Sequence, residues 1–229
     1  MEKSCCFLFD NFKKLGISLA AFSAILFAAE QAKGTPETNM LVNVQIVDGG
    51  LEKCGAEIVG SSGDYWNSNG CPLYSGDVPA ESDDPFFGAA ILWNSASEPT
   101  EMSIYAYSAY DQVYVNEPDT SSTDPLFQSV GQTAGGGDWQ LEIDNLAYSG
   151  TWYIYVYASP VLDYPDGAFV SFDVDSLAGT GTGSTSVIAG EYYSILEVDE
   201  VVAGSNIVIN ISSDYEPVCN GLQIWFHNP

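Results

Sequence analysis

The chain has 229 residues, of which 46 % are apolar and only 16 % are charged, so it can build a full hydrophobic core and is not disordered throughout. Its formal net charge is −26, with five basic residues against 31 acids. Phosphate recognition depends on Lys and Arg side chains. This balance therefore excludes nucleic acid and anionic lipid surfaces as partners.

Residues 1–34 have the pattern of a secretory signal peptide. Lys13 and Lys14 precede the apolar run Leu15 to Ala29, which suits a signal sequence and is short for a membrane span. The cleavage site Ala32-Lys33-Gly34 predicts one mature domain over residues 35–229, with an uncleaved anchor as the alternative. Processing would remove four of five basic residues and three of 31 acids, which leaves one Lys against 28 acids. We therefore expect a secreted or cell-surface protein without membrane contact after cleavage.

Export implies an oxidising compartment, in which cysteines can pair. Cys54, Cys71 and Cys219 remain after processing. The most local pair, Cys54–Cys71, would close a loop of about 17 residues and stabilise the fold by on the order of 3 kcal/mol. Pairing of either residue with Cys219 is the alternative. The only histidine is His227, and no Cys-x-x-Cys motif occurs, which argues against a zinc site.

The mature chain reads as a series of short strands, because runs of β-branched and aromatic residues are separated by Gly, Pro, Asn, Asp and Ser. In chain order the expected strands are Leu41–Val47, Gly88–Trp93, Met102–Val115 (two strands or one bent strand), Trp139–Leu146, Thr151–Ala158, Ala168–Val174, Tyr192–Val198, Asn206–Ser212 and Leu222–Phe226. The Gly-rich segments 131–137 and 179–186 are expected to be loops. The pattern predicts an all-β fold, a two-sheet antiparallel β-sandwich or jelly roll, preceded by a signal-peptide helix.

Alternation within these strands predicts which faces are buried. The segments 139–144 and 207–212 alternate apolar and polar residues, so one face of each should pack in the core and the other should contact water. In the segment 152–157 every second residue is Tyr, so three tyrosines should point to one side. Trp225 should face away from the core, opposite its neighbours Ile224 and Phe226.

Three segments carry a family resemblance: 60–67 (GSSGDYWN), 141–157 (LEIDNLAYSGTWYIYVY) and 219–224 (CNGLQI). Their order and spacing resemble secreted galactose-binding-like β-sandwich domains of planctomycete and verrucomicrobial-type bacteria. Those domains often carry an exosortase sorting tail, which is absent here, and this sequence adds an acidic loop between Pro72 and Pro85. The resemblance implies a jelly-roll fold and an extracellular setting. It implies no particular ligand, because a fold does not determine a function.

Aromatic residues are the candidates for ligand binding. Sugar rings stack on exposed aromatic faces, while amides and carboxylates bind their hydroxyl groups. The candidates are Trp66, Asn67, Tyr105, Tyr107 and Trp225. The competing interpretation is that these residues fill the core or cover the sheets, and for Trp66 we expect a structural plug at one end of the sandwich.

Acidic loops are candidates for calcium, which takes oxygen ligands from carboxylates and carbonyls. Asp77, Glu81, Asp83 and Asp84 form one candidate set, and Asp119 with Asp124 forms a second. Neither set matches an EF-hand loop, and the alternative is that these acids are simply solvated.

Catalysis is disfavoured by the shortage of suitable side chains. A Ser-His-Asp triad would have to use His227, two positions from the end of the sequence. A hydrolase that uses two carboxylates is the least favoured hypothesis, because no motif in the sequence marks such a pair. We therefore expect an exported, non-catalytic binding module, carbohydrate-binding and braced by calcium. The alternative is a structural protein of the cell surface or extracellular matrix whose partners are neighbouring copies of itself.

Overall fold

The computed structural model describes residues 39–47, 53–55, 57–70, 87–89, 91–108, 113–116, 124–128, 130–133, 136–158, 168–174, 182–188 and 191–227. The expected signal peptide and its helix lie outside these residues, so that expectation stays a prediction. Within the described ranges, no helix is long and apolar enough to cross a membrane.

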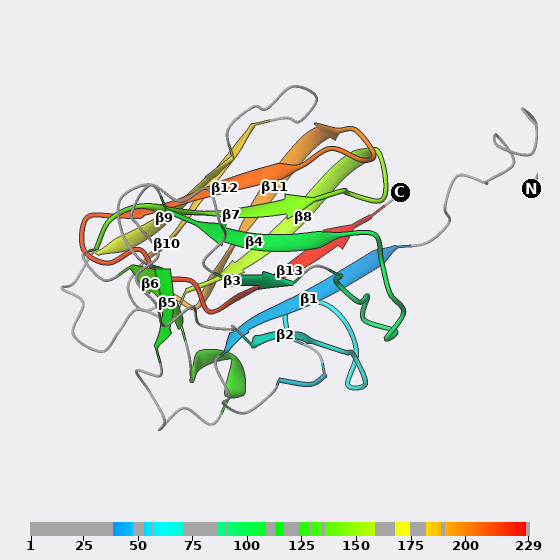
Figure 1. Ribbon diagram of the computed structural model, residues 1–229, viewed down its shortest axis with the longest axis horizontal. Coiled ribbons are helices and arrows are strands. Elements are labelled where there is room, and N and C mark those ends of the chain that lie inside the picture. The colour runs from blue at the N-terminus through cyan, green and yellow to red at the C-terminus, as the bar shows by residue number, and fades with distance from the viewer. Residues whose placement is uncertain are drawn as a thin grey trace, which may run out of the picture. The chain divides into compact units, whose positions relative to one another are not determined.

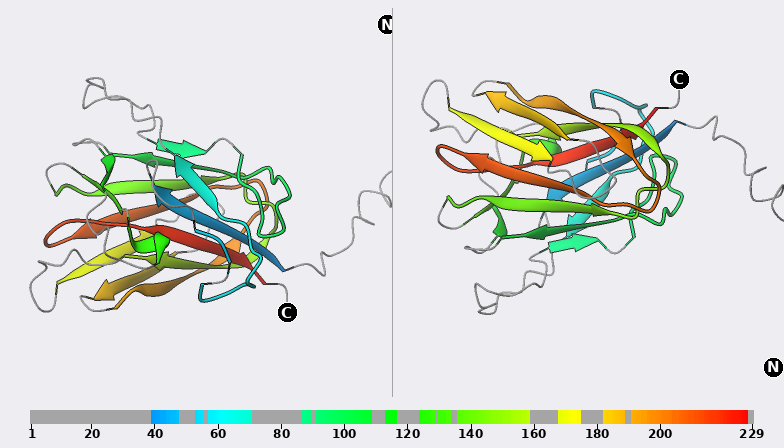
Figure 2. Two further views of the ribbon diagram at one scale, coloured as in Figure 1. Left: turned by 90° about the horizontal axis from the view of Figure 1, so that it is seen from below. Right: turned by 90° about the horizontal axis from the view of Figure 1, so that it is seen from above.

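Two β-sheets pack face to face around one apolar core (Figures 1 and 2). Sheet A has the strand order β11-β8-β13-β1-β2, and sheet B has the order β10-β9-β12-β7-β4-β3. The strands of sheet A are β1 (Met40–Val47), β2 (Asn67–Gly70), β8 (Gly150–Tyr157), β11 (Tyr193–Val201) and β13 (Gly221–Phe226). Those of sheet B are β3 (Phe87–Ala89), β4 (Ser103–Tyr107), β7 (Trp139–Asp144), β9 (Phe169–Val174), β10 (Gly183–Ile188) and β12 (Ile207–Ser213). A separate ribbon joins β5 (Val113–Asn116) to β6 (Val130–Thr133), and η1 (Pro125–Phe127) is a short 3-10 turn.

The predicted all-β, two-sheet sandwich is confirmed. All pairs of strands are antiparallel except β1 with β2 among the residues that the structure describes. The predicted alternation is confirmed as well: Leu141 and Ile209 of sheet B share the core with Ile154 and Ile224 of sheet A. Burial on one face follows from the two-residue period of a strand, which sends successive side chains to opposite sides.

Three strands were not expected from the sequence. β2 consists of Asn-Ser-Asn-Gly, and β6 and β10 lie in segments predicted to be Gly-rich loops. The loop prediction is wrong for these parts because pairing with β1, β5 and β9 overrides weak β-propensity. The segment 102–115 contains two strands, β4 and β5, which was one of the two expected forms. In the segment 88–93 the ladder ends at Ala89, and Trp93 makes only a single bridge to Pro99.

The outer face of sheet A is covered by other parts of the chain. The three tyrosines of β8 point to one side, as predicted, and Tyr155 and Tyr157 are buried there. Trp66 and Leu126 pack against them. The residues before β2 and the turn η1 therefore form a third layer over part of this sheet.

Buried side-chain amides hold this layer in place. Gln223 of β13 accepts hydrogen bonds from the backbone N–H groups of Ile58 and Val59 at 3.2 and 3.3 Å, and donates to the carbonyl of Val59 at 2.9 Å. Gln45 of β1 donates to the carbonyl of Pro125 at 2.9 Å and accepts from the backbone N–H of Lys53 at 2.7 Å. Each amide replaces water for backbone groups that would otherwise be buried without partners.

An ion triad joins the two parts of the layer. The Nζ atom of Lys53 lies 2.7 Å from Glu57 and 2.6 Å from Asp124. Burial by itself would lower the pKa of Lys53, but the hydrogen bonds and charges of Asp124 and Glu57 outweigh it and raise the pKa. Asp124 also accepts from the backbone N–H of Leu126 at 2.9 Å, which caps η1. This expected calcium ligand is therefore paired within the protein.

Gly221 offers a test of how the third layer fits. A Cβ at this position would lie 2.4 Å from the carbonyl oxygen of Val44 and 3.0 Å from Leu126. Gly221→Ala should therefore lower the free energy of unfolding by about 1–3 kcal/mol, measured by urea denaturation. The control is Gly63→Ala, because a Cβ at Gly63 would meet no atom within 4 Å. Equal losses in the two variants would contradict the steric argument.

Candidate functional site

The outer face of sheet B gathers aromatic and polar side chains on adjacent strands. β4, β7 and β12 lie side by side (Figure 1), and the residues that alternate with the core residues point away from it. In register, Tyr105 pairs with Glu142, and Tyr107 pairs with Gln140, which in turn pairs with Asn210. We call the following residues the sheet-B face: Ser103, Tyr105, Tyr107, Gln140, Glu142, Asp144, Asn206 and Asn210.

Two tyrosines form the aromatic part of the sheet-B face. The rings of Tyr105 and Tyr107 are partly exposed, and their centroids lie 6.4 Å apart with planes tilted by 57°. Burial raises the pKa of Tyr107, and the charges of Glu142 and Asp144 raise it further. The phenol therefore stays neutral at physiological pH and keeps a proton to donate.

Two carboxyl groups lie beside the tyrosines on β7. Burial, the charge of Asp144 and a hydrogen bond with Asp144 raise the pKa of Glu142, while a 3.0 Å hydrogen bond from Asn206 lowers it. The Oδ1 atom of Asp144 is buried and accepts no hydrogen bond from any described group. Glu142 is partly exposed, so it is the member of the pair that presents an acceptor to a hydroxyl donor.

Amide side chains extend this polar row across the sheet. Gln140 is exposed and donates to the Oδ1 atom of Asn210 on β12 at 2.6 Å. Flat aromatic rings, carboxylate acceptors and oriented amides next to one another are the groups that bind a sugar ring and its hydroxyls. The geometry therefore suits a neutral polyhydroxylated ligand.

The carboxyl pair does not have the arrangement of a glycosidase. Glu142 and Asp144 lie two positions apart on β7, so their side chains leave the same side of the strand. Glycosidases use two carboxyl groups that flank the scissile bond from opposite sides. Neighbours on one side of a single strand are not arranged in this way.

The structure separates the five residues that the sequence suggested for ligand binding. Of the five, Tyr105 and Tyr107 lie beside polar side chains on the sheet-B face. Trp66 is 3 % exposed and donates its indole N–H to the carbonyl of Gly55 at 2.8 Å, so it is a buried plug against Tyr157 rather than a stacking platform. The buried amide of Asn67 is bonded to backbone groups of the fold, including the carbonyl of Asn43 at 2.9 Å, so it offers no group to a ligand.

Trp225 lies on the other sheet, partly exposed on the outer face of sheet A. It stacks on His227 with ring centroids 4.9 Å apart and packs against Tyr153 at 5.8 Å. The Nδ1 atom of His227 is paired with the Oδ1 atom of Asn39 at 2.8 Å. The imidazole that a triad would need is therefore held against a tryptophan and an amide.

The polar members of the sheet-B face were not among the predicted binding residues, although the sequence contains a signal for some of them. Alternation places Gln140, Glu142 and Asp144 on the wet side of their strand. The pairing of β4 with β7, which brings them beside Tyr105 and Tyr107, is a long-range contact with no local signal.

The predicted disulfide is not supported at the cysteines that the structure describes. Cys54 is exposed with a free thiol, and Cys219 is buried with a free thiol. Burial raises the pKa of Cys219 to about 12, and its Sγ atom lies 3.6 Å from the carbonyl oxygen of Gly221. Cys71 lies outside the described residues, and these free thiols argue equally against the Cys54–Cys219 alternative.

The first predicted calcium set falls outside the described residues. This holds for Asp77, Glu81, Asp83 and Asp84, so these ligands stay a prediction. In the part of the chain that the structure describes, no group of three or more His, Cys, Asp or Glu side chains could hold a metal ion.

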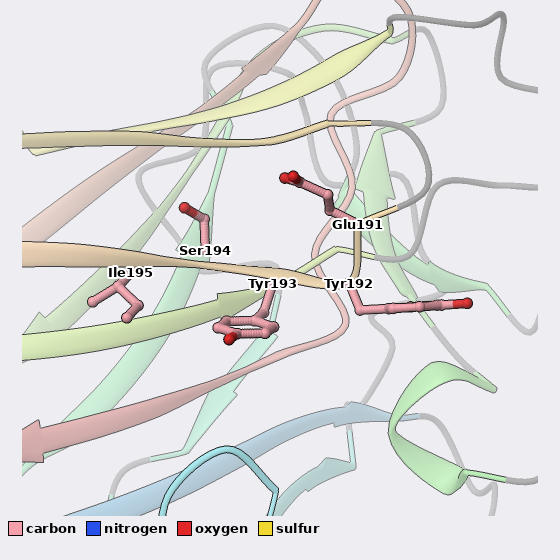
Figure 3. A pocket seen from close by; sticks show the side chains of 5 residues that line it. All are labelled: Glu191, Tyr192, Tyr193, Ser194 and Ile195. Atoms are coloured by element: carbon pink, nitrogen blue, oxygen red, sulfur yellow. The ribbon is translucent and has the colours of Figure 1, made fainter.

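A shallow cavity of about 530 Å³ lies at the start of β11 and is lined by Glu191, Tyr192, Tyr193, Ser194 and Ile195. Figure 3 shows that Glu191 and Ser194 point to one side of the strand, whereas Tyr193 and Ile195 point to the other. Ser194 is also hydrogen-bonded to Thr185 of β10. The polar and aromatic groups of this cavity therefore point in different directions and do not converge on one ligand position. On the sheet-B face, by contrast, the tyrosines and the polar groups lie on the same side of the sheet.

No family model and no curated protein matches this chain. One similar solved structure is the module TmCBM61 in complex with β-1,4-galactotriose, which is 13 % identical, with 55 % of this chain and 84 % of that chain covered and a TM-score of 0.31. Another is the enzymatically active domain of tailspike protein 4 from bacteriophage CBA120, at 11 % identity, 54 % and 18 % coverage and a TM-score of 0.27. Such low TM-scores support no conclusion about this chain, and the family resemblance stays a prediction.

Glu142 should make stability depend on pH. Its pKa is raised above the ordinary value of 4.5, so between that value and the folded pKa the native state binds more protons than the unfolded state. Stability should therefore fall as pH rises through this window. Glu142→Gln should raise the melting midpoint at pH 7, with a smaller gain below pH 4.5.

The matched control for Glu142→Gln is Asp173→Asn, which removes a carboxylate from the outer side of the nearby strand β9. Thermal melts from pH 4 to pH 8 test both variants. An unchanged midpoint for Glu142→Gln at pH 7 would show that the carboxyl pair carries no strain.

Proposed function

We propose that this protein is an exported, non-catalytic carbohydrate-binding module that binds its glycan on the sheet-B face. The observation that carries the proposal is that Tyr105 and Tyr107 lie beside Glu142 and Asp144 on the outer side of sheet B, where all four side chains are partly exposed. Export rests on the signal-peptide pattern of residues 1–34, and a secreted or cell-surface location follows from it.

Binding would combine stacking with hydrogen bonds at the ring edge. The apolar face of a sugar would lie on Tyr105 or Tyr107, and hydroxyl groups would donate to the partly exposed carboxylate of Glu142. Gln140 of β7 lies between Tyr107 and Asn210, so it would contact the next ring across the sheet toward β12. The net charge of −26 repels anionic polysaccharides, so the ligand should be a neutral glycan.

Two observations support a binding role without chemistry. His227 is engaged by Trp225 and Asn39. Lys53, the only basic residue outside positions 1–34 besides His227, is bound to Glu57 and Asp124. The basic side chains that could activate a nucleophile are therefore used elsewhere.

A structural role at the cell surface or in the extracellular matrix is the second candidate. It is favoured by exposed apolar side chains around the edge strand β11, where Ile188, Tyr192 and Ile195 are 48 %, 60 % and 45 % exposed. Exposed apolar groups at a sheet edge are suited to pairing with another copy of the chain. Calcium would then bridge acidic surfaces of neighbouring copies, or brace the acidic loops of a single copy.

Removal of a tyrosine ring should weaken glycan binding at the sheet-B face. Tyr105→Ala and Tyr107→Ala should each weaken binding to a neutral oligosaccharide by about tenfold, because one stacking contact is lost. Tyr107→Phe keeps the ring and should lose less. A glycan array followed by calorimetry gives the measurement, and Tyr215→Ala, at an exposed tyrosine beyond β12, is the control. No selective binding on a broad array, or wild-type affinity in both alanine variants, would refute the proposal.

Calcium should raise the melting midpoint if it braces the fold, since a ligand that binds only the native state stabilises it. Melts with millimolar calcium and with chelator test this point. Light scattering on the same samples tests assembly, which should show growth with protein and calcium concentration. Identical melts with calcium and with chelator would refute calcium binding, and a monomer at every calcium level would refute the assembly role.

A further inference from the structure

A second pair of aromatic residues is exposed away from the sheet-B face. Trp93 is 40 % exposed and Tyr65 is 39 % exposed, whereas Trp139 and Trp152 are almost fully buried. The ring centroids of Tyr65 and Trp93 lie 6.5 Å apart, with planes tilted by 58°. Two partly exposed rings in contact form one aromatic surface that a ligand can reach, which a single exposed ring does not.

Buried amides hold the backbone on both sides of this pair. Asn67 accepts from the N–H of Trp93 at 2.8 Å and donates to the carbonyl of Trp93 at 2.7 Å. Asn43 donates to the carbonyl of Tyr65 at 2.9 Å. Gln223 donates to the Oδ1 atom of Asn43 at 2.8 Å, which connects the pair to the amides that hold the third layer. Asn67, expected to contact a ligand, is instead a positioning residue for Trp93.

The hairpin that carries Trp93 is also fixed at its tip. The Oδ1 atom of Asn94 accepts from the backbone N–H groups of Ala96 and Glu98 at 3.0 and 2.9 Å. Ser95 donates its N–H to the carbonyl of Leu41 at 2.7 Å and accepts from the N–H of Tyr65 at 2.9 Å. The two rings are therefore presented by a rigid frame, which lowers the entropy cost of binding.

The tip of the same hairpin carries polar groups. The side-chain amide of Asn94 donates to the Oε2 atom of Glu98 at 3.1 Å, and both residues belong to the tip next to Trp93 in the chain. Aromatic rings with a carboxylate and an amide on the same hairpin offer the same kinds of group as the sheet-B face. No cation accompanies it among the described residues, since Lys53 is held by Glu57 and Asp124.

We propose that Tyr65 and Trp93 form a second glycan-binding site, which takes a neutral oligosaccharide by stacking and lies apart from the sheet-B face. The site is carried by the residue stretch before β2 and by the hairpin between β3 and β4. It shares the ligand class of the proposed function but none of its residues. Two sites on one module would let the protein bind a polysaccharide at two points and gain avidity.

The test uses the wild-type protein with hexaoses of β-1,4-linked galactose, glucose, mannose and xylose. Calorimetry gives the number of sites, and tryptophan emission reports on the exposed ring of Trp93. We expect two sites in the wild type and one in the Tyr105→Ala/Tyr107→Ala double variant, whose emission still responds. Trp93→Ala should weaken the second site by about tenfold, and Trp93→Phe should retain most of the affinity.

The variants separate this inference from the proposed function. Loss of all binding in the double variant, with Trp93→Ala equal to the wild type, would overturn the second site and leave the first. Binding that survives in the double variant and is lost in Trp93→Ala would support the second site and overturn the first. No binding of any hexaose would overturn both.

Two further measurements test whether the variants stay folded and whether a second copy covers the rings. Melting midpoints within the range of the wild type, with Tyr215→Ala as the exposed-tyrosine control, show that a loss of affinity is not a loss of fold. Sedimentation gives the oligomeric state. A dimer in the wild type that Trp93→Ala dissolves would assign the surface to self-association and overturn the glycan site.

Discussion

Buried side-chain amides on the outer face of sheet A are the interaction on which the rest of the structure depends. Gln45, Asn43 and Gln223 are fully buried, and they bind backbone groups of the segment that covers the sheet. Loss of one would leave several donors and acceptors in the interior without partners, at a cost of about 1–3 kcal/mol for each group. The same amides close one face of the sandwich and fix the frame of Tyr65 and Trp93.

The charge of the protein shapes what it can bind. With Lys53 enclosed by Glu57 and Asp124, the described surface presents carboxylates without neighbouring cations. On the sheet-B face, Glu142 lies beside Asp144. Burial and the charge of Asp144 raise the pKa of Glu142, and this shift works against stability at neutral pH. A strained acidic pair next to partly exposed tyrosines is the kind of local cost that functional sites carry. A sugar hydroxyl that donates to the partly exposed carboxylate of Glu142 would relieve part of this cost.

Two aromatic surfaces with similar chemistry differ in how they are built. Tyr105 and Tyr107 stand on regular strands, so their spacing follows from the two-residue period of β4. Tyr65 and Trp93 lie outside regular strands and owe their positions to Asn43 and Asn67. A rigid sheet and a rigid frame of amides both hold aromatic rings in place before a ligand binds. Each arrangement lowers the entropy cost of ordering those side chains at binding.

The sequence by itself determined the β-sandwich and the side of each regular strand that enters the core. These follow from local period and composition, as the buried Leu141 and Ile209 and the outward Trp225 show. It also marked Tyr105 and Tyr107. Tertiary structure alone decided that Asn-Ser-Asn-Gly forms β2, that Trp66 and Asn67 are enclosed, and that the tyrosines of β4 meet Glu142. Those outcomes depend on contacts between segments far apart in the chain, and a local pattern of residues carries no record of such contacts.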